Sequence, residues 1–120
     1  MTIERIKVGP RMSQAVIHGD QVYLAGQVAD DPNADVAGQT RQILAKIDAL
    51  LAEADSDKSK LLSAIVWLSD ISTFDQMNAV WDEWVTPSKP PARATVESRL
   101  ARQEFKVEIM VVAVSHFAHK

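Results

Sequence analysis

The chain contains no cysteine among its 120 residues, only four glycines and a single tyrosine. Without cysteine the protein has no disulfide framework, no thiolate nucleophile and no cysteine-ligated metal site. No Gly-rich phosphate loop, serine elbow or HExxH motif occurs, so nucleotide hydrolases, α/β-hydrolases and zincins have no local support. No apolar run is long enough to cross a bilayer or to form a signal peptide core. These absences predict a cytoplasmic protein that does not contact a membrane.

The charge and composition exclude further classes of protein. Lys and Arg number 13 against 16 Asp and Glu, a formal net charge of -3, and the cations are scattered along the chain. Binding to nucleic acid through its phosphates is therefore not expected. Hydrophobic residues make up 47% and charged residues 24%, which is near the globular average and excludes intrinsic disorder. The length then predicts a single domain over residues 1–120.

The hydrophobic pattern predicts a mixture of strands and helices. An opening segment around 3–8 is broken by Gly9-Pro10. The elements expected after it are hairpin strands over 14–17 and 21–25, a helix over 36–54 capped by Asp35, a strand over 61–68 covered on both faces, a helix that begins at a Thr73–Gln76 capping box and ends at Pro87, and strands over 92–98 and 105–114. The tail from residue 115 is expected to be loose. This order predicts an α+β fold, a single mixed sheet with both helices packed on one face.

Two charged residues stand out in the last two predicted strands. Alternation places Glu108 on one strand face with Lys106, Met110 and Val112. Its neighbours there are largely apolar, so the carboxylate needs a cationic or water partner. Arg93 follows a stiff Pro-Pro approach at the start of its strand, and its guanidinium is suited to hold a planar carboxylate through two parallel hydrogen bonds. Two interpretations remain open: Arg93 binds the carboxylate of a ligand, or it forms a salt bridge with Glu108 or another acid and no ligand is involved.

The histidines and tryptophans have structural and functional interpretations. His116 and His119 have the i, i+3 spacing of a metal pair, but a tail of this composition is more often a mobile end, and no metal is predicted. His18 is expected in the exposed hairpin turn. The tryptophans are expected in the core, with contact to a second subunit as the alternative; they are Trp67, Trp81 and Trp84.

Five short motifs occur in order along nearly the whole chain. They are SQAV at Ser13–Val16, AGQ at Ala25–Gln27, MNAVW at Met77–Trp81, PARATVE at Pro91–Glu97 and KVEI at Lys106–Ile109. Together they resemble the RidA/YjgF family, the reactive intermediate deaminases once labelled endoribonuclease L-PSP. The resemblance implies a chorismate-mutase-like α+β subunit that assembles as a homotrimer, with small-molecule clefts between neighbouring subunits.

The resemblance also implies a reaction and its residues. The archetypal reaction of the family is the hydrolysis of enamines or imines such as 2-aminoacrylate to a 2-keto acid and ammonia, and it uses no cofactor. Arg93 would hold the substrate carboxylate, Glu108 would move protons, and the backbone carbonyl of Thr95 would orient the attacking water. Further substrate-binding positions of the family match Asn78, Gly26 and Met12.

Three residues depart from the family pattern. Met12 stands nearest to a position where active members commonly have a tyrosine, Ala25 replaces a hydroxyl residue, and Met110 replaces a second glutamate. Arg11 is either a surface residue or a second cation near the cleft. The resemblance thus implies a divergent subfamily, and it leaves the physiological substrate open.

Three functions compete for this sequence. The first is a deaminase of small carboxylate-bearing imines, and the second is a protein that binds a small carboxylate such as a keto acid in the same cleft with little or no catalysis. The third is an endoribonuclease, for which the sequence offers no basic groove, no catalytic histidine pair and no stacking platform. The first is the function that the sequence favours.

Overall fold

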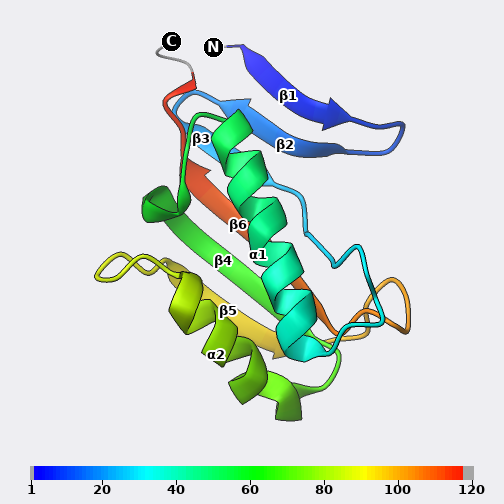
Figure 1. Ribbon diagram of the computed structural model, residues 1–120. Coiled ribbons are helices and arrows are strands. Elements are labelled where there is room, and N and C mark those ends of the chain that lie inside the picture. Colours follow the sequence, from blue (N-terminus) through cyan, green and yellow to red (C-terminus); the bar gives the residue numbers. More distant parts are fainter. Residues whose placement is uncertain (1, 118–120) are drawn as a thin grey trace.

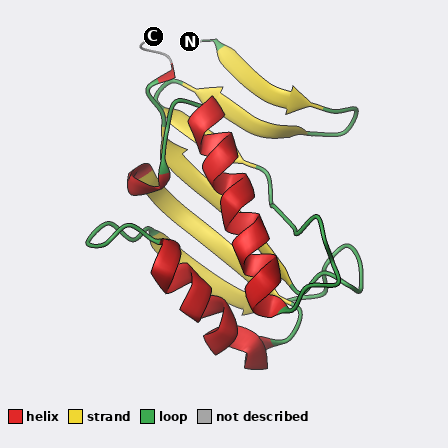
Figure 2. Cartoon of the chain, in the orientation of Figure 1, coloured by secondary structure: helices red, strands yellow, loops and turns green. Residues whose placement is uncertain are grey.

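The computed structural model describes residues 2–117, in which a six-stranded sheet carries its helices on one face (Figure 1). Figure 2 shows both long helices on the same side of the strands. The elements are β1 (Ile3–Val8), β2 (Ser13–His18), β3 (Gln21–Leu24), α1 (Val36–Glu53), the 3-10 turn η1 (Lys58–Lys60), β4 (Leu61–Leu68), the 3-10 turn η2 (Ile71–Thr73), α2 (Phe74–Trp84), β5 (Ala92–Glu97) and β6 (Val107–Val114). The predicted α+β class is confirmed. No helix in this part of the chain has the length and hydropathy of a transmembrane span.

The strand order is β1-β2-β3-β6-β4-β5, so β1 and β5 are the edge strands and β6 is internal. The β4–β5 pair is parallel and the other pairs are antiparallel. Helix α2 makes the crossover between β4 and β5, while α1 packs beside it on the same face. As a result, the strand that carries Glu108 is in the middle of the sheet and the strand that carries Arg93 is at its edge.

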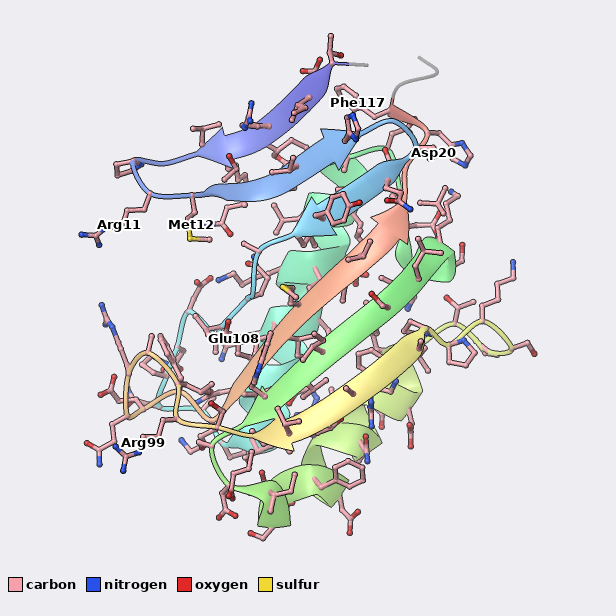
Figure 3. All side chains as sticks on the ribbon, turned by 180° about the vertical axis from the view of Figure 1, so that it is seen from behind. Arg11, Met12, Asp20, Arg99, Glu108 and Phe117 are labelled. Carbon is pink, nitrogen blue, oxygen red and sulfur yellow. The ribbon has the colours of Figure 1, made fainter. Side chains whose placement is uncertain are left out.

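The two faces of the sheet differ in burial. In β6 the residues that alternate with Glu108 lie under the helices and are at most 1% exposed, whereas Glu108, Met110 and Val112 are half-buried on the other face, here called the open face. Figure 3 views the molecule from this side, with the helices behind the strands. The prediction that the strand over 61–68 is covered on both faces is wrong for the single subunit, because no element among residues 2–117 lies over its open face.

The first strand, β1, was not predicted from the sequence. Its residues are nearly all exposed, so it has no buried face that a hydrophobic pattern would reveal. It is held by backbone pairing to β2, and Lys7, with a φ of 52°, interrupts this pairing between Ile6 and Val8. A strand stabilised mainly by backbone hydrogen bonds leaves little signal in side-chain composition.

The predicted capping box before α2 is wrong. The hydroxyl of Thr73 donates to the carbonyl of Asp70 at 2.6 Å, no side chain caps α2, and Gln76 is exposed. Instead, the Asp70 carboxylate accepts from the backbone N–H of Ser72 at 2.9 Å and begins η2. The short-range pairing of Asp70 with Ser72 therefore starts the helical segment earlier than the Thr73–Gln76 spacing indicates.

The remaining boundaries are close to prediction. Asp35 caps α1 as expected by accepting from the backbone N–H of Gly38 at 2.8 Å. Helix α2 ends at Trp84, before Pro87. The expectation of a loose tail is wrong at Ser115, which is buried and donates its hydroxyl to the carbonyl of Ala54.

One buried polar residue, Gln39, ties α1 to two loops. Its side chain is 0% exposed, and its amide nitrogen donates to the carbonyls of Pro32, Ala34 and Glu104 at 3.0–3.1 Å. Its amide oxygen accepts from the backbone N–H of Lys106 at 2.9 Å. Gln39 therefore positions both the loop that follows residue 27 and the entry into β6, the strand that carries Glu108.

Replacement of Gln39 tests this role. Gln39→Ala is expected to lower the free energy of unfolding by about 3 kcal/mol, because it leaves several buried backbone groups without partners. Equilibrium urea unfolding at fixed protein concentration measures the change. Gln42→Ala is the matched control, since the side-chain hydrogen bonds of Gln42 within residues 2–117 go to the exposed loop residue Asp31. An equal, small loss in both variants would contradict the role.

Candidate functional site

Arg93 lies on the helix-covered face of the edge strand β5. Its register partner in β4 is Ala64, which is 2% exposed beneath the helices. The guanidinium Nη2 donates to Oδ1 of Asn78 at 2.7 Å, and the guanidinium carbon lies 5.0 Å from the ring centroid of Trp81 and 5.8 Å from that of Phe74. Helix α2 thus holds the guanidinium by one hydrogen bond and two cation–π contacts.

The charge of Arg93 is not neutralised by an ion pair within residues 2–117. Partial burial lowers the pKa of Arg93 below the usual range of arginine, and the negative charge of Asp82 acts in the opposite direction. An arginine nevertheless stays protonated in proteins. A partly desolvated guanidinium with spare N–H donors is well suited to bind a carboxylate or another planar anion.

Thr95 lies two residues further along β5, on the same face as Arg93. Its register partner is Val66, which is fully buried, and its hydroxyl is buried with no hydrogen-bond partner among the residues that the structure describes. Because β5 is an edge strand, backbone groups along its outer side are not paired within the sheet. The part predicted for the Thr95 carbonyl, orienting a water, stays a prediction.

Glu108 lies on the open face of β6. Its register partner is Trp67 in β4, and the next residue on the same face is Met110, so the predicted apolar surroundings are confirmed. No hydrogen bond or ion pair to its carboxylate occurs within residues 2–117. Burial raises the pKa of Glu108 above the usual range of a glutamate. Glu108 is therefore a carboxyl group that can hold a proton more readily than an exposed one.

Gly26 lies directly against this carboxyl group. A Cβ atom placed on Gly26 would be 2.1 Å from Oε2 of Glu108 and 3.0 Å from its Cδ. The segment around Gly26 is held next to β6 by backbone hydrogen bonds in both directions between Gln27 and Ile109, at 2.8 and 3.1 Å. The structure thus brings together Gly26 and Glu108, two of the residues predicted for the site.

The salt bridge between Arg93 and Glu108, one of the two interpretations of the sequence, does not form. Strand β4 separates β5 from β6, and the two side chains leave the sheet on opposite faces. Arg99 is exposed in the loop after β5 and points away from Glu108 in Figure 3. The candidate site therefore consists of an arginine half (Arg93, Asn78 and Thr95) and a glutamate half (Glu108 and Gly26) that do not meet within one subunit.

Met12 and Arg11 lie at the tip of the β1–β2 hairpin (Figure 3). Met12 is 49% exposed and Arg11 is exposed. The structure does not bring Met12 into contact with either half of the site in the single subunit, so its predicted substrate contact stays a prediction.

The histidines and tryptophans are divided between core and surface. His18 is exposed at the end of β2, as predicted, and His119 lies outside the described residues. Trp81 is buried against Arg93, whereas Trp84 is half-buried and donates to the Asp48 carboxylate. Core placement is therefore confirmed for Trp81, while Trp67 is half-buried on the open face.

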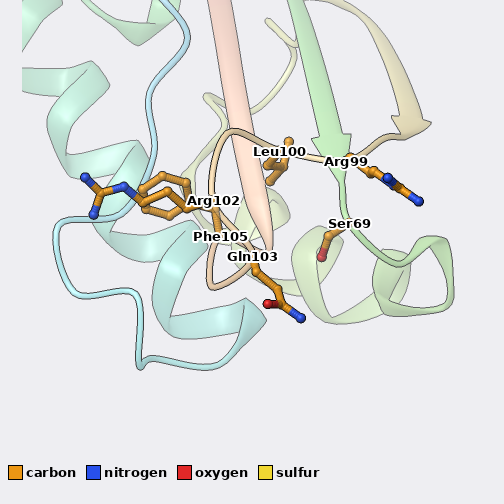
Figure 4. A pocket seen from close by; sticks show the side chains of 6 residues that line it. All are labelled: Ser69, Arg99, Leu100, Arg102, Gln103 and Phe105. Carbon is orange, nitrogen blue, oxygen red and sulfur yellow. The ribbon is translucent and has the colours of Figure 1, made fainter.

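A cavity of about 470 Å³ lies under the loop between β5 and β6 (Figure 4). Its walls are formed by Ser69, Arg99, Leu100, Arg102, Gln103 and Phe105. Figure 4 shows the guanidinium groups of Arg99 and Arg102 pointing in opposite directions, so they do not converge on one anion. The cavity contains none of the residues of the arginine or glutamate half, and a site shared by two subunits would not be enclosed in one.

Sequence reasoning missed the aromatic contacts of Arg93. Met77 and Trp81 of α2 are buried in the core, and the same two side chains also contact the guanidinium. The available signal was the spacing of Phe74, Met77 and Trp81, which places three polarisable side chains on one helix face. Only the strand-to-helix crossover reveals that Arg93 meets that face.

The fold and these residues define a class of protein: a small α+β subunit with an unneutralised arginine on one sheet face and a glutamate on the other. Comparison with known proteins identifies the family. The chain belongs to the YjgF/Rid/RutC family, because the family model described as Endoribonuclease L-PSP matches residues 2–115.

Relatives agree with this assignment over most of their length. A RutC family protein of Haemophilus ducreyi is 44% identical over 111 residues, which cover 92% of this chain and 95% of the relative. The RutC family protein YoaB of Escherichia coli is 42% identical over 113 residues, covering 94% and 98%. The crystal structure of a YjgF family member from Neisseria meningitidis superposes with a TM-score of 0.94 at 43% identity, covering 96% of each chain.

The raised pKa of Glu108 predicts a pH-dependent stability. The folded protein favours the protonated form of Glu108. This contribution to stability is complete below the pKa of a glutamate in the unfolded chain, about 4.3, and it is lost as pH rises through the pKa of Glu108 in the folded protein. Glu108→Gln, which is neutral at every pH, is therefore expected to stabilise the protein well above this range and to change nothing well below it. Urea unfolding midpoints measured well below and well above this pH range give the difference, and Glu83→Gln, at an exposed position, is the control. A pH-independent effect of Glu108→Gln would contradict the assignment.

Proposed function

We propose that the protein is a cofactor-independent hydrolytic deaminase of small carboxylate-bearing enamines and imines of the 2-aminoacrylate type. The observation that carries the proposal is Arg93, a partly buried cation held by Asn78 and Trp81 that forms no ion pair with a carboxylate among residues 2–117. Such a group binds a substrate carboxylate through paired hydrogen bonds. Membership of the Rid family, introduced above as the reactive intermediate deaminases, adds support.

The reaction needs both halves of the site, so we propose that the active site lies between subunits of a homotrimer. Arg93 and Glu108 leave opposite faces of one sheet, and only a second copy of the chain can bring one to the other. The open face also carries half-buried or exposed apolar side chains that a neighbouring subunit would cover, among them Trp67, Tyr23 and Val96. Small ligands bind preferentially at such boundaries.

The proposed mechanism requires few groups. Arg93 fixes the carboxylate, and a proton delivered to C3 of the enamine converts it to the imine, which is electrophilic at C2. Water adds to C2, the nitrogen takes up a proton, and ammonia leaves while the hydroxyl proton is lost, so that enamine and water give a 2-keto acid and ammonia. In this scheme Glu108 donates and recovers these protons, and the raised pKa that burial gives its carboxyl supports the role.

A second candidate is a protein that binds a small carboxylate without turning it over. Methionines stand at two positions where a tyrosine and a second glutamate were expected, and Met110 is next to Glu108 on the open face. Neither methionine side chain can exchange a proton. Calorimetric binding of a keto acid without ammonia release from any imine would favour this candidate over the deaminase.

The ribonuclease activity in the description of the family model is not proposed for this chain. Its net charge is -3, and the two arginines of the loop cavity diverge rather than form a groove for phosphates (Figure 4). RNA degradation that survives stringent purification and disappears in Glu108→Ala would contradict this view.

Loss of the Arg93 guanidinium is expected to abolish most of the activity. Arg93→Ala should lower kcat/KM for freshly generated 2-aminoacrylate by about 100-fold, because two charge-assisted hydrogen bonds to the carboxylate are lost. Ammonia and keto acid release measure the rate, light scattering confirms the assembly, and a blank without protein gives the spontaneous rate. Arg41→Ala, an exposed arginine of α1, is the control. Full activity of Arg93→Ala would overturn the proposal.

A site shared between subunits can be tested by complementation. Subunits with Arg93→Ala and subunits with Glu108→Ala are expected to be inactive alone. Mixed and reassembled in equal amounts, they should recover about one quarter of the wild-type activity, since one site in four then combines an intact Arg93 with an intact Glu108. Absence of recovery in trimers shown to be mixed by mass spectrometry would contradict the shared site.

A further inference from the structure

The contact between Gly26 and Glu108 is closer than any side chain at position 26 would allow. The 2.1 Å separation between an added Cβ and Oε2 of Glu108 is far below a van der Waals contact, so that one methyl group and the carboxyl cannot share this space. The obstructing atom is the end of a flexible side chain rather than backbone. An alanine at this position would therefore displace the carboxyl and leave the strands in place.

The backbone around Gly26 does not require a glycine for its conformation. Among the described glycines, only Gly19 has a positive φ, so that any residue can adopt the backbone of Gly26. The position is fixed by the Gln27–Ile109 backbone pair, and the buried amide of Gln27 donates to Oε1 of Gln14 at 2.9 Å and to the carbonyl of Ala25 at 3.0 Å. What Gly26 provides is empty space at a rigidly held point.

The surroundings offer the carboxyl no other anchor. Strand β4 contains no ionisable side chain. The ionisable side chain of β3 is Tyr23, which lies opposite Val112 and donates its hydroxyl to Gln21. Lys106, two residues before Glu108, donates its ammonium group to the carbonyl of Ala34 instead. Shape rather than charge therefore holds the carboxyl where it is.

We propose that Gly26 is a positioning residue for Glu108: because position 26 has no side chain, the carboxyl can lie against the open face, at the depth where it exchanges protons with the substrate. This inference rests on the proposed deaminase function for its catalytic consequence but not for its geometry. It predicts that Gly26→Ala moves the carboxyl toward solvent, which removes part of the burial that favours the protonated form.

The geometry is tested without any substrate. Proteins labelled with 13C at the glutamate side-chain carboxyls are titrated by NMR, and the Glu108 signal is assigned by its loss in Glu108→Gln. In Gly26→Ala the Glu108 titration is expected to shift to lower pH than in wild type. In Gly9→Ala, the matched control, it is expected to stay in place, because a Cβ at Gly9 meets its nearest atom at an ordinary 3.4 Å.

A double-mutant cycle provides a second readout that does not depend on the titration. Gly26→Ala is expected to change the thermal midpoint of the wild-type protein, in which the methyl group displaces the carboxyl, and to leave that of Glu108→Ala unchanged, because the carboxyl is absent there. Equal shifts in both backgrounds would show that position 26 acts through the backbone alone and would overturn the proposal.

Kinetics then connect the geometry to the reaction. Gly26→Ala is expected to reduce kcat for 2-aminoacrylate by about 10- to 100-fold with little change in KM, since Arg93 still holds the carboxylate. An unchanged Glu108 titration in Gly26→Ala would overturn the positioning role. A different result is also informative: the Glu108 titration shifts in Gly26→Ala and the double-mutant cycle shows coupling, but the wild-type protein releases no ammonia from any imine. That result would confirm the positioning role and contradict the proposed function.

Discussion

The alternation of side chains along a strand is the constraint on which the rest of this structure depends. A period of two sends Arg93 to the helix-covered face and Glu108 to the open face, and the intervening strand β4 prevents either from turning to the other. Both groups are therefore partly desolvated without the partner that normally compensates for burial. Such uncompensated charges are characteristic of sites that wait for a ligand.

Around this arrangement, neutral contacts do the positioning. Arg93 is held by an amide oxygen and aromatic rings, and Glu108 by the shape of the surface at Gly26. The buried Gln39 links α1 to the loop that enters β6, the strand of Glu108. Because none of these contacts cancels a charge, the guanidinium and the carboxyl remain available for the ligand binding and proton transfer that we propose.

The sequence predicted the fold wherever side chains carry the signal. The run over 61–68 and the alternation from Val107 onward are strands because burial under two helices requires it, and Asp35 begins a helix because its carboxylate satisfies a free backbone N–H. The exposed strand β1 left no such signal. For the site, the residue types were visible, but the face on which Arg93 lies depends on strand order and register, which single strands do not encode.

The left-handed residue Lys7 has a consequence for how copies of this chain can associate. Strand β1 is a free edge of the sheet, and free edges are where sheets of different molecules join into continuous fibrils. At Lys7 the backbone leaves the extended conformation, so that β1 offers only a short, interrupted ladder of donors and acceptors to another strand. The opposite edge, β5, begins directly after two prolines. The interrupted β1 is a poor template for another strand, and the prolines limit pairing beyond the start of β5, so neither edge favours growth of the sheet from molecule to molecule.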